Sequence, residues 1–164
     1  MKTIIVYYSL EGNTEYAAKK LAEYIGADTL SLHTVKAYPD SGFRKFFWGG
    51  KSAVMAETPV LEDYAFEPSA YDRIVLGFPV WASNVAPPIR TFIRDNDLSG
   101  KSLAFLACQS GNGAEKAFAK LKKALGTEEV TAQLVLIDPK SKPTEENEQK
   151  LRDFADKLTK QQQE

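Results

Sequence analysis

The chain has 164 residues, of which 43% are hydrophobic and 26% are charged, and its formal net charge is -1. This composition is typical of a soluble globular domain, and no apolar run approaches the roughly 20 residues that a membrane-spanning helix needs. A net charge near zero is also unlike the basic surface of nucleic-acid-binding proteins. We therefore expect a single domain over 1–164, without a membrane span and without a nucleic-acid partner.

The inventory of reactive side chains is small, since His33 is the single histidine and Cys108 the single cysteine. One cysteine excludes an internal disulfide, a CxxC redox pair and a zinc site built from several cysteines. One histidine in a strand-like pattern is a poor candidate for the base of a catalytic dyad. Redox chemistry would have to come from a bound cofactor, and we expect neither a metal site nor a catalytic side chain.

The N-terminal segment 1–8 carries one lysine and an apolar run shorter than the about 7 to 15 residues of a signal-peptide core. It is not followed by a cleavage site of small residues. We therefore expect the protein to remain in the cytoplasm.

Strand-like and helix-like patterns alternate along the chain. Several segments rich in branched and aromatic residues are continuous apolar runs, as in strands that are covered on both faces. Apolar residues at helical spacing predict helices, two of which end at a glycine and one of which opens with prolines. In chain order we predict a strand over 3–8, a helix over 14–25, strands over 28–35 and 73–78, a helix over 87–95, a strand over 102–108, a helix over 114–125, a strand over 131–137 and a helix from Thr144. This alternation predicts an α/β fold, a three-layer α/β/α sandwich with a parallel sheet.

Residues 36–70, between the second and third predicted strands, show no clean period. Their first part, an irregular aromatic insertion at about 36–56, is too long for a plain connection, and such loops in compact domains are commonly binding lids. The part over 57–72 has no basic residue but five acidic ones, Glu57, Glu62, Asp63, Glu67 and Asp72. This acidic stretch is either a solvated loop or a docking surface for a basic partner.

The loops that follow the strands are the candidate ligand site, because ligands of open parallel sheets bind at the carboxyl ends of the strands. After the first strand, the segment 9–14 places hydroxyls, an amide and a flexible glycine at the start of a helix. Backbone N–H groups and the helix dipole can surround a phosphate there, or Ser9 or Asn13 can simply cap the helix. The P-loop signature GxxxxGK[ST] is absent.

Two further loops have features of a binding site. In the segment 79–84, after the third strand, Trp81 is placed either to stack on a flat ring or to pack under the following helix. In the segment 109–113, after the fourth strand, two glycines let the backbone approach a ligand, with N–H groups for the carbonyls of a heterocycle. The alternative for this segment is a simple turn from strand to helix.

Together, the Ser-x-x-Gly-Asn-Thr pattern of 9–14, the tryptophan-bearing loop and the glycine-rich loop resemble the flavodoxin family. The resemblance covers nearly the whole chain, and the uninterrupted fifth strand is similar to the short-chain branch. It implies a five-stranded parallel sheet of order 2-1-3-4-5 and noncovalently bound FMN. It assigns the phosphate to Ser9, Glu11, Gly12, Asn13 and Thr14, the flanks of the flavin ring to Pro79, Val80, Trp81, Ala82, Ser83 and Asn84, and the pyrimidine edge of the ring to Gln109, Ser110, Gly111, Asn112 and Gly113.

Three features depart from the family pattern. Glu11 stands where the loop usually has a threonine, so this position would serve through its backbone N–H. Ala82 stands where glycine is common; the family turns over this peptide to bond N5 of the half-reduced flavin, and a positive φ costs alanine about 1 to 2 kcal/mol more than glycine. We therefore expect weak stabilisation of half-reduced flavin. The net charge of -1 is milder than in typical flavodoxins, so long-range steering toward a basic partner should be weak.

The resemblance implies an FMN-binding electron-transfer protein, a monomer or weak dimer that meets redox partner proteins through the acidic stretch 57–72. An alternative on the same fold is an NAD(P)H-dependent FMN or quinone oxidoreductase, for which the aromatic segment 43–50 would line a second substrate or a subunit interface. A receiver-type signalling domain would require an acidic pair after the first strand and a phosphoacceptor aspartate after the third. The chain has Tyr7-Tyr8 and Phe78-Pro79 at those places.

Overall fold

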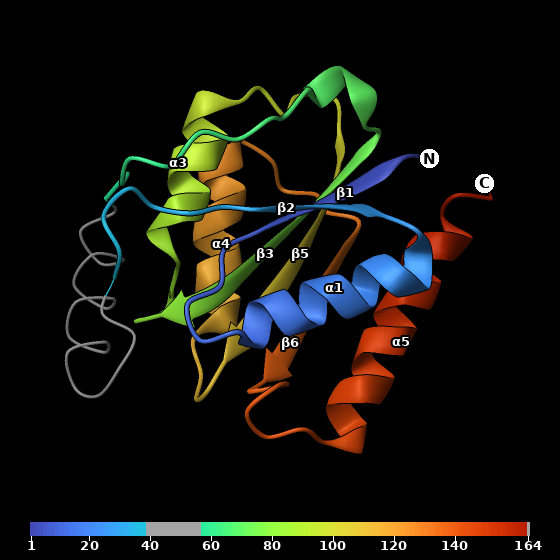
Figure 1. Cartoon of the computed structure of the whole chain (residues 1–164). Coiled ribbons are helices and arrows are strands. Elements are labelled where there is room, and N and C mark those ends of the chain that lie inside the picture. Colours follow the sequence, from blue (N-terminus) through green and yellow to red (C-terminus); the bar gives the residue numbers. More distant parts are fainter. Residues whose placement is uncertain (39–56, 164) are drawn as a thin grey trace.

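A parallel sheet forms the middle layer of the molecule (Figure 1). The structure is a computed structural model that describes residues 1–38 and 57–163. The main strands lie in the order β2-β1-β3-β5-β6, which confirms the predicted order of the five strands. Their bounds are β1 (Thr3–Tyr7), β2 (Asp28–Ser31), β3 (Arg73–Trp81), β5 (Ser102–Gln109) and β6 (Ala132–Ile137), and the short β4 (Asn84–Val85) pairs antiparallel with the end of β3.

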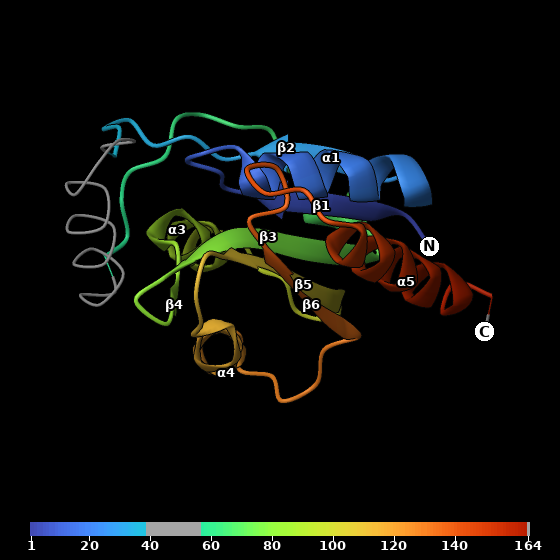
Figure 2. The ribbon, with the colours of Figure 1, turned by 90° about the horizontal axis from the view of Figure 1, so that it is seen from below.

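Helices cover both faces of the sheet, as expected for an α/β/α sandwich (Figure 2). The core on one face joins α1 (Asn13–Ile25) and α5 (Glu145–Lys160), and the core on the other joins α3 (Pro87–Asp95) and α4 (Ala114–Leu125). Successive side chains of a strand point to opposite faces, so β1 sends Ile4 and Val6 into one core and Ile5 and Tyr7 into the other. This explains why the strands are continuous apolar runs.

The second strand is shorter than predicted, since β2 ends at Ser31 and not at residue 35. Leu32 makes the last bond to β1, by donating its N–H to Tyr7 O at 2.8 Å. The chain then pairs elsewhere: residues 33–35 bond with residues 60–62 around an antiparallel bridge between Thr34 and Leu61. The strand-like pattern of 32–35 therefore serves a second pairing outside the sheet.

The third strand is longer than predicted because it turns back into a two-residue hairpin. Trp81 pairs with Asn84, and the residues between them, Ala82 and Ser83, have φ of 49° and 61°. Positive φ at both central residues is the geometry of a type I′ turn, which usually carries Asn-Gly. Ala-Ser gave no such signal, so the sequence placed Trp81 in a loop although it is the last residue of β3.

The connection between β2 and β3 is described only from residue 57 onward, where it contains a short 3-10 helix, η1 (Pro68–Ala70). The expected insertion at about 36–56 falls, from residue 39, outside the described residues, as does the aromatic segment 43–50. In the part of the chain that the structure describes, every helix is too short or too polar to span a bilayer.

Candidate functional site

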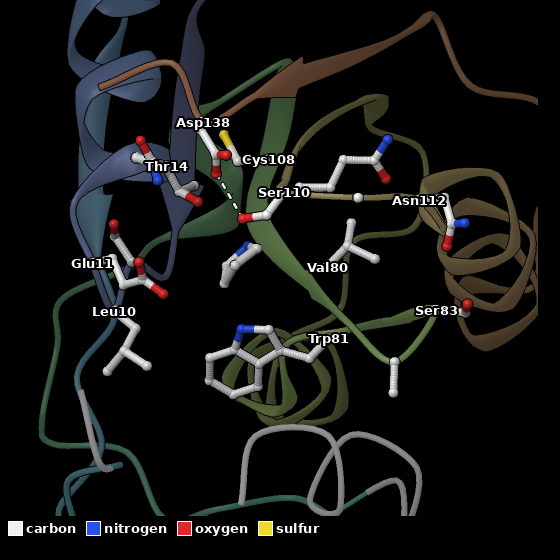
Figure 3. Close-up of a pocket in the computed structure, with 16 residues that line it drawn as sticks. Leu10, Glu11, Thr14, Val80, Trp81, Ser83, Cys108, Ser110, Asn112 and Asp138 are labelled. Atoms are coloured by element: carbon white, nitrogen blue, oxygen red, sulfur yellow. Dashed lines mark hydrogen bonds between the residues drawn. The ribbon is translucent and has the colours of Figure 1, made fainter. Parts of the chain in front are cut away.

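One pocket of 420 Å³ opens at the carboxyl edge of the sheet, where the loops after β1, β3 and β5 meet (Figure 3). All three loops that the sequence singled out contribute to its wall. Thr14 and Asp138 lie at one end of the pocket and Trp81 at the other. The lining residues are Ser9, Leu10, Glu11, Asn13, Thr14, Pro79, Val80, Trp81, Ala82, Ser83, Cys108, Gln109, Ser110, Gly111, Asn112 and Asp138.

The loop after β1 leaves the start of α1 open to the pocket. Gly12, with φ of 100°, is the N-cap residue of α1 and offers no side-chain cap, while its own N–H donates to Ser9 Oγ at 3.2 Å. Thr14, in the first turn, is buried and lines the pocket. Because no N-cap side chain covers the first turn, its N–H groups and the positive end of the helix dipole are available to an anion.

Asn13 has a role that sequence patterns did not indicate. Its Oδ1 accepts the backbone N–H groups of Lys140 and Ser141 at 2.8 and 3.0 Å, and its Nδ2 donates to Ser141 Oγ at 3.0 Å. Although Asn13 lines the pocket, its amide ties the loop between β6 and α5 to the start of α1. This loop is a fourth component of the site.

Trp81 is held by two tyrosines. Its ring centroid lies 5.9 Å from that of Tyr8 and 5.3 Å from that of Tyr38, and both contacts are edge-to-face. The two tyrosines also meet each other edge-to-face at 6.2 Å. Burial raises the pKa of the Tyr8 phenol, so Tyr8 stays neutral at physiological pH. The indole therefore lines the pocket and packs on the core at the same time. Its position is compatible both with stacking on a flat ring and with packing on the protein.

Two residues assigned to the flavin ring, Asn84 and Gly113, support the wall from behind and are not part of the lining. Asn84 is buried; its Nδ2 donates to Ala82 O at 2.7 Å and its Oδ1 accepts from Lys120 Nζ at 2.8 Å. Gly113 gives room to the hairpin, since a Cβ at this position would lie 2.9 Å from Ser83 Cα. The strained hairpin is thus fixed from both sides.

The loop after β5 is shaped by Gln109, whose Oε1 accepts the N–H of Ala114 at 3.0 Å. The N-cap of α4, Gly113, has no side chain, so this bond satisfies a donor of the first helical turn from outside the helix. The side-chain oxygen of Gln109 therefore already accepts a hydrogen bond from the protein itself. Ser110, Gly111 and Asn112 are exposed and line the open side of the pocket.

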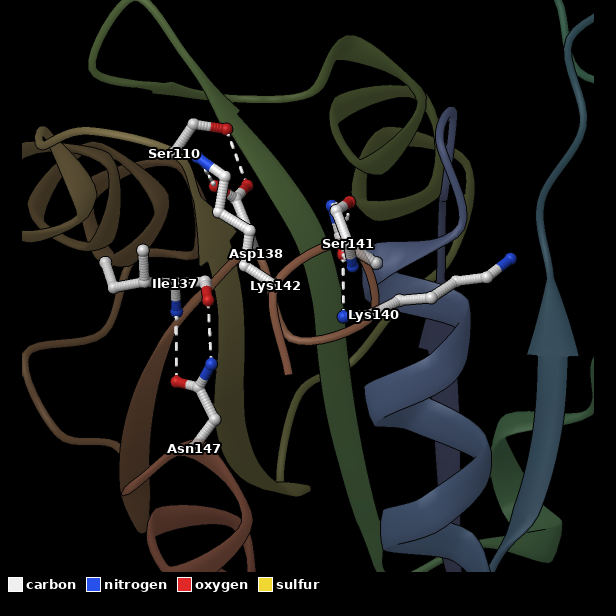
Figure 4. Close-up of polar contacts among 8 residues, drawn as sticks. Ser110, Ile137, Asp138, Lys140, Ser141, Lys142 and Asn147 are labelled. Carbon is white, nitrogen blue, oxygen red and sulfur yellow. Dashed lines mark hydrogen bonds and ion pairs between the residues drawn. The ribbon is translucent and has the colours of Figure 1, made fainter. Parts of the chain in front are cut away.

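The sequence missed three lining residues, Leu10, Cys108 and Asp138. Asp138, 7% exposed and with φ of 43°, accepts the hydroxyl of Ser110 at 2.7 Å, and its Oδ2 lies 3.7 Å from Lys142 Nζ (Figure 4). Asp138 directly follows the fifth predicted strand. Since ligands of open parallel sheets bind at the carboxyl ends of the strands, this position could have been predicted in the same way as the other three loops. Burial raises the pKa of the Cys108 thiol to about 12, so this thiol is neutral.

The pocket combines polar and aromatic walls with two carboxylates, Glu11 and Asp138. Among residues 1–38 and 57–163 no group of three or more histidine, cysteine, aspartate or glutamate side chains could hold a metal ion. The arrangement can hold an anion at the start of α1 and a flat apolar group beside Trp81.

Comparison with known proteins gives a consistent result. A family model described as Flavodoxin matches residues 2–151, whereas no curated protein matches. A candidate flavoprotein from Bacteroides uniformis has a similar structure, with a TM-score of 0.78 and 23% identity over 94% of this chain and 97% of that one.

Two further solved structures share the fold. A flavoprotein from Lactobacillus acidophilus in complex with FMN has a TM-score of 0.71 and 20% identity over 84% of this chain and 93% of that one. Oxidised flavodoxin 2 from Bacillus cereus has a TM-score of 0.63 and 19% identity, with 98% and 99% of the two chains covered. Since the family model spans nearly the whole sequence and the fold agrees with it, this chain belongs to the flavodoxin family.

Proposed function

We propose that the protein binds FMN noncovalently in the pocket at the carboxyl edge and serves as an electron carrier. The observation that carries this proposal is the meeting of three separate loops around one pocket of 420 Å³, within the usual range of about 300 to 1,000 Å³ for ligand sites. The FMN complex of the similar Lactobacillus acidophilus flavoprotein supports the choice of cofactor.

The donor set fits a phosphorylated flavin. The start of α1 offers N–H groups without an N-cap side chain, together with the hydroxyls of Ser9 and Thr14, and these are the groups that bind phosphate at a helix N-terminus. At the other end, Val80 and Trp81 offer an apolar wall of the kind that flat rings prefer. In this assignment, residues 9–14 hold the phosphate, and residues 79–83 and 109–112 enclose the ring.

The chain's own residues would act by fixing and shielding the cofactor. FMN, when bound, would supply the capacity to accept and donate electrons. Trp81, fixed by Tyr8 and Tyr38, would exclude water from one side of the ring. Asn84 would keep the hairpin in place, because it is buried and bonded to the Ala82 carbonyl. We take these contacts, which fix the wall of the pocket, to support a carrier over an enzyme.

The position of Ala82 bears on the redox properties. Since Ala82 already has φ of 49°, its cost in the left-handed region, about 1 to 2 kcal/mol, is present before any change of redox state. Its carbonyl is also engaged by Asn84 at 2.7 Å. A turnover of the Ala82–Ser83 peptide would have to break this bond, so we keep the expectation of weak stabilisation of half-reduced flavin.

A second candidate function is that of an NAD(P)H-dependent FMN or quinone oxidoreductase. It is favoured by a second hollow of 490 Å³ that shares Ser83, Gln109 and Asn112 with the main pocket and offers space for another substrate nearby. The aromatic segment 43–50, which this function would use, lies outside the described residues.

For the carrier we propose a cytoplasmic location and redox partner proteins that dock on part of the acidic stretch. The stretch is not one patch. Glu62 donates its N–H to His33 O, in the segment that follows the carboxyl end of β2, whereas Asp72 precedes β3 and accepts the N–H of Lys2 at the opposite edge. The candidates for docking near the pocket are therefore the exposed residues in or near the segment that bonds with 33–35, which are Glu57, Glu62 and Asp63.

The first test is the purified protein itself. A yellow protein that releases FMN on heating, and whose colourless form takes up added FMN, is the expected result. A colourless protein that does not take up FMN would overturn the proposal. Stopped-flow mixing with NADPH then separates the two candidates: rapid bleaching of the flavin band near about 450 nm favours the oxidoreductase, and an unchanged band favours the carrier.

A further inference from the structure

Lys140 lies next to the 9–14 loop although it is 127 residues from Asn13 in the sequence. Its backbone N–H donates to Asn13 Oδ1 at 2.8 Å, and the N–H of Ser141 donates to the same oxygen at 3.0 Å (Figure 4). Two backbone bonds to one side chain fix the path of this part of the β6–α5 loop. The backbone of Lys140 is therefore held beside the start of α1.

The side chain of Lys140 lies across Gly12. A Cβ built at Gly12 would lie 2.8 Å from Lys140 Nζ and 3.2 Å from its Cδ, so the lysine occupies the space that a side chain at residue 12 would take. Lys140 is not part of the pocket lining. Its ammonium thus approaches the 9–14 loop from outside the pocket, close to the positive end of the α1 dipole.

The charges nearby are arranged in pairs, apart from Lys140. Lys19 lies 3.1 Å from Glu15, and Lys142 lies 3.7 Å from Asp138. Lys140 forms no salt bridge with any residue in 1–38 or 57–163. Lys140 also acts on the first turn of α1: Lys19 holds the pKa of the Glu15 carboxyl below its ordinary value, and the charge of Lys140 adds to this effect.

We propose that Lys140 is a phosphate-recognition residue, whose ammonium gives this site its preference for FMN over flavins that lack a phosphate. The inference rests on the proposed function. The 9–14 loop has no cationic side chain of its own and contains a carboxylate, Glu11, whereas a phosphate monoester carries about -1.5 to -2 charges at pH 7. The ammonium lies 2.8 Å from where a Cβ at Gly12 would stand, so it reaches the loop that would hold the phosphate. A unit charge beside this loop would attract such a dianion, even when it is partly screened by water.

Asn13 has a positioning role for Lys140. Its amide binds the β6–α5 loop and thereby places Lys140, while its backbone belongs to the phosphate loop. Removing this amide should weaken phosphate recognition through the position of Lys140. The effects of changing Asn13 and Lys140 should therefore not add, as is usual for residues that act through one another.

The test compares the affinities of the apoprotein for FMN and for riboflavin, measured by quenching of flavin fluorescence. Lys140→Gln should weaken FMN binding about tenfold and change riboflavin binding by less than about twofold, since only FMN carries the phosphate. Lys140→Arg should restore most of the FMN affinity. The matched control is Lys101→Gln, which removes the same charge next to the start of β5, at the opposite edge of the sheet. It should leave both affinities unchanged.

Two further measurements sharpen the test. The FMN affinity of the unchanged protein should fall more steeply with added salt than that of Lys140→Gln, because one charge contact is missing in the variant. Asn13→Ala should reduce the preference for FMN, and the double variant with Lys140→Gln should lose little more than Lys140→Gln alone.

The outcomes are distinguishable. Equal losses for FMN and riboflavin would mean that Lys140 acts through the shape of the loop, and an unchanged FMN affinity would mean that its charge is not used. Either result overturns this inference while the proposed function stands. If the protein without substitutions binds neither FMN nor riboflavin, both this inference and the proposed function are overturned.

Discussion

The close packing of Gly113 on the hairpin can be tested by measuring the stability of a variant. Gly113 has φ of 103°, and a Cβ there would lie 2.7 Å from Ser83 Oγ and 2.9 Å from Ser83 Cα. The hydroxyl could rotate away, but the Cα could move only with the whole hairpin. Gly113→Ala therefore adds two separate costs, one in the backbone of residue 113 and one in packing against Ser83.

The magnitude follows from these two costs. An alanine in the left-handed region costs about 1 to 2 kcal/mol, and forcing an extra methyl into a filled space costs typically about 1 to 3 kcal/mol. We expect Gly113→Ala to lower the free energy of unfolding by about 2 to 5 kcal/mol.

Two other glycines separate the backbone cost from the packing cost. Gly126 has φ of 68° but nothing within 4 Å of a Cβ, so its replacement by alanine should cost the backbone term alone, about 1 to 2 kcal/mol. Gly111 has neither a positive φ nor a neighbour within 4 Å of a Cβ. Its replacement by alanine should change the unfolding free energy by less than about 1 kcal/mol, since the alanine fits and restricts the unfolded chain.

The assay is urea unfolding of the three apoproteins, followed by FMN titration of the folded ones. Gly113→Ala should be the least stable and should also weaken FMN binding, because the displaced Ser83 belongs to the wall of the pocket. A loss for Gly113→Ala no larger than that for Gly126→Ala would show that the hairpin yields without cost. The hairpin would then not be fixed from both sides.

Three other predictions follow. Glu11→Thr should tighten FMN binding about three- to tenfold by removing a carboxylate near the phosphate, and weaker binding in a fluorescence titration would reveal a structural role for this carboxylate. Glu148 accepts from Tyr16 Oη at 2.6 Å and from Lys20 Nζ at 2.9 Å, which hold its pKa below the ordinary value. Its contribution is therefore present above about pH 4.3 and is lost as the pH falls through the lowered pKa. Glu148→Gln should cost about 1 kcal/mol in urea unfolding at pH 7 and progressively less toward pH 3, and a constant difference would contradict this. Cys108, 4% exposed and with a pKa of about 12, should not react with a thiol reagent at pH 8 in the folded protein and should react at once in urea.

The sequence predicted the order of elements and the meeting of three loops at one edge of the sheet well, because these features depend on local patterns. Apolar runs and helical spacing placed the main strands and helices, and the helices 87–95 and 114–125 have the predicted bounds. Parallel pairing then brings the loops after β1, β3 and β5 to one edge of the sheet, whatever the details of packing. The prediction of a common site needed no knowledge of side-chain contacts.

The polar contacts of the site were decided only by the tertiary structure. The hairpin at Ala82 and Ser83 has no turn sequence, and it forms because buried Asn84 and Gly113 support it. The bond between Asn13 and Lys140 joins residues 127 positions apart, and no periodicity along the chain encodes such a pair. A local pattern can show which edge of the sheet holds the pocket, whereas the packing of the whole chain determines which charge lies beside the 9–14 loop.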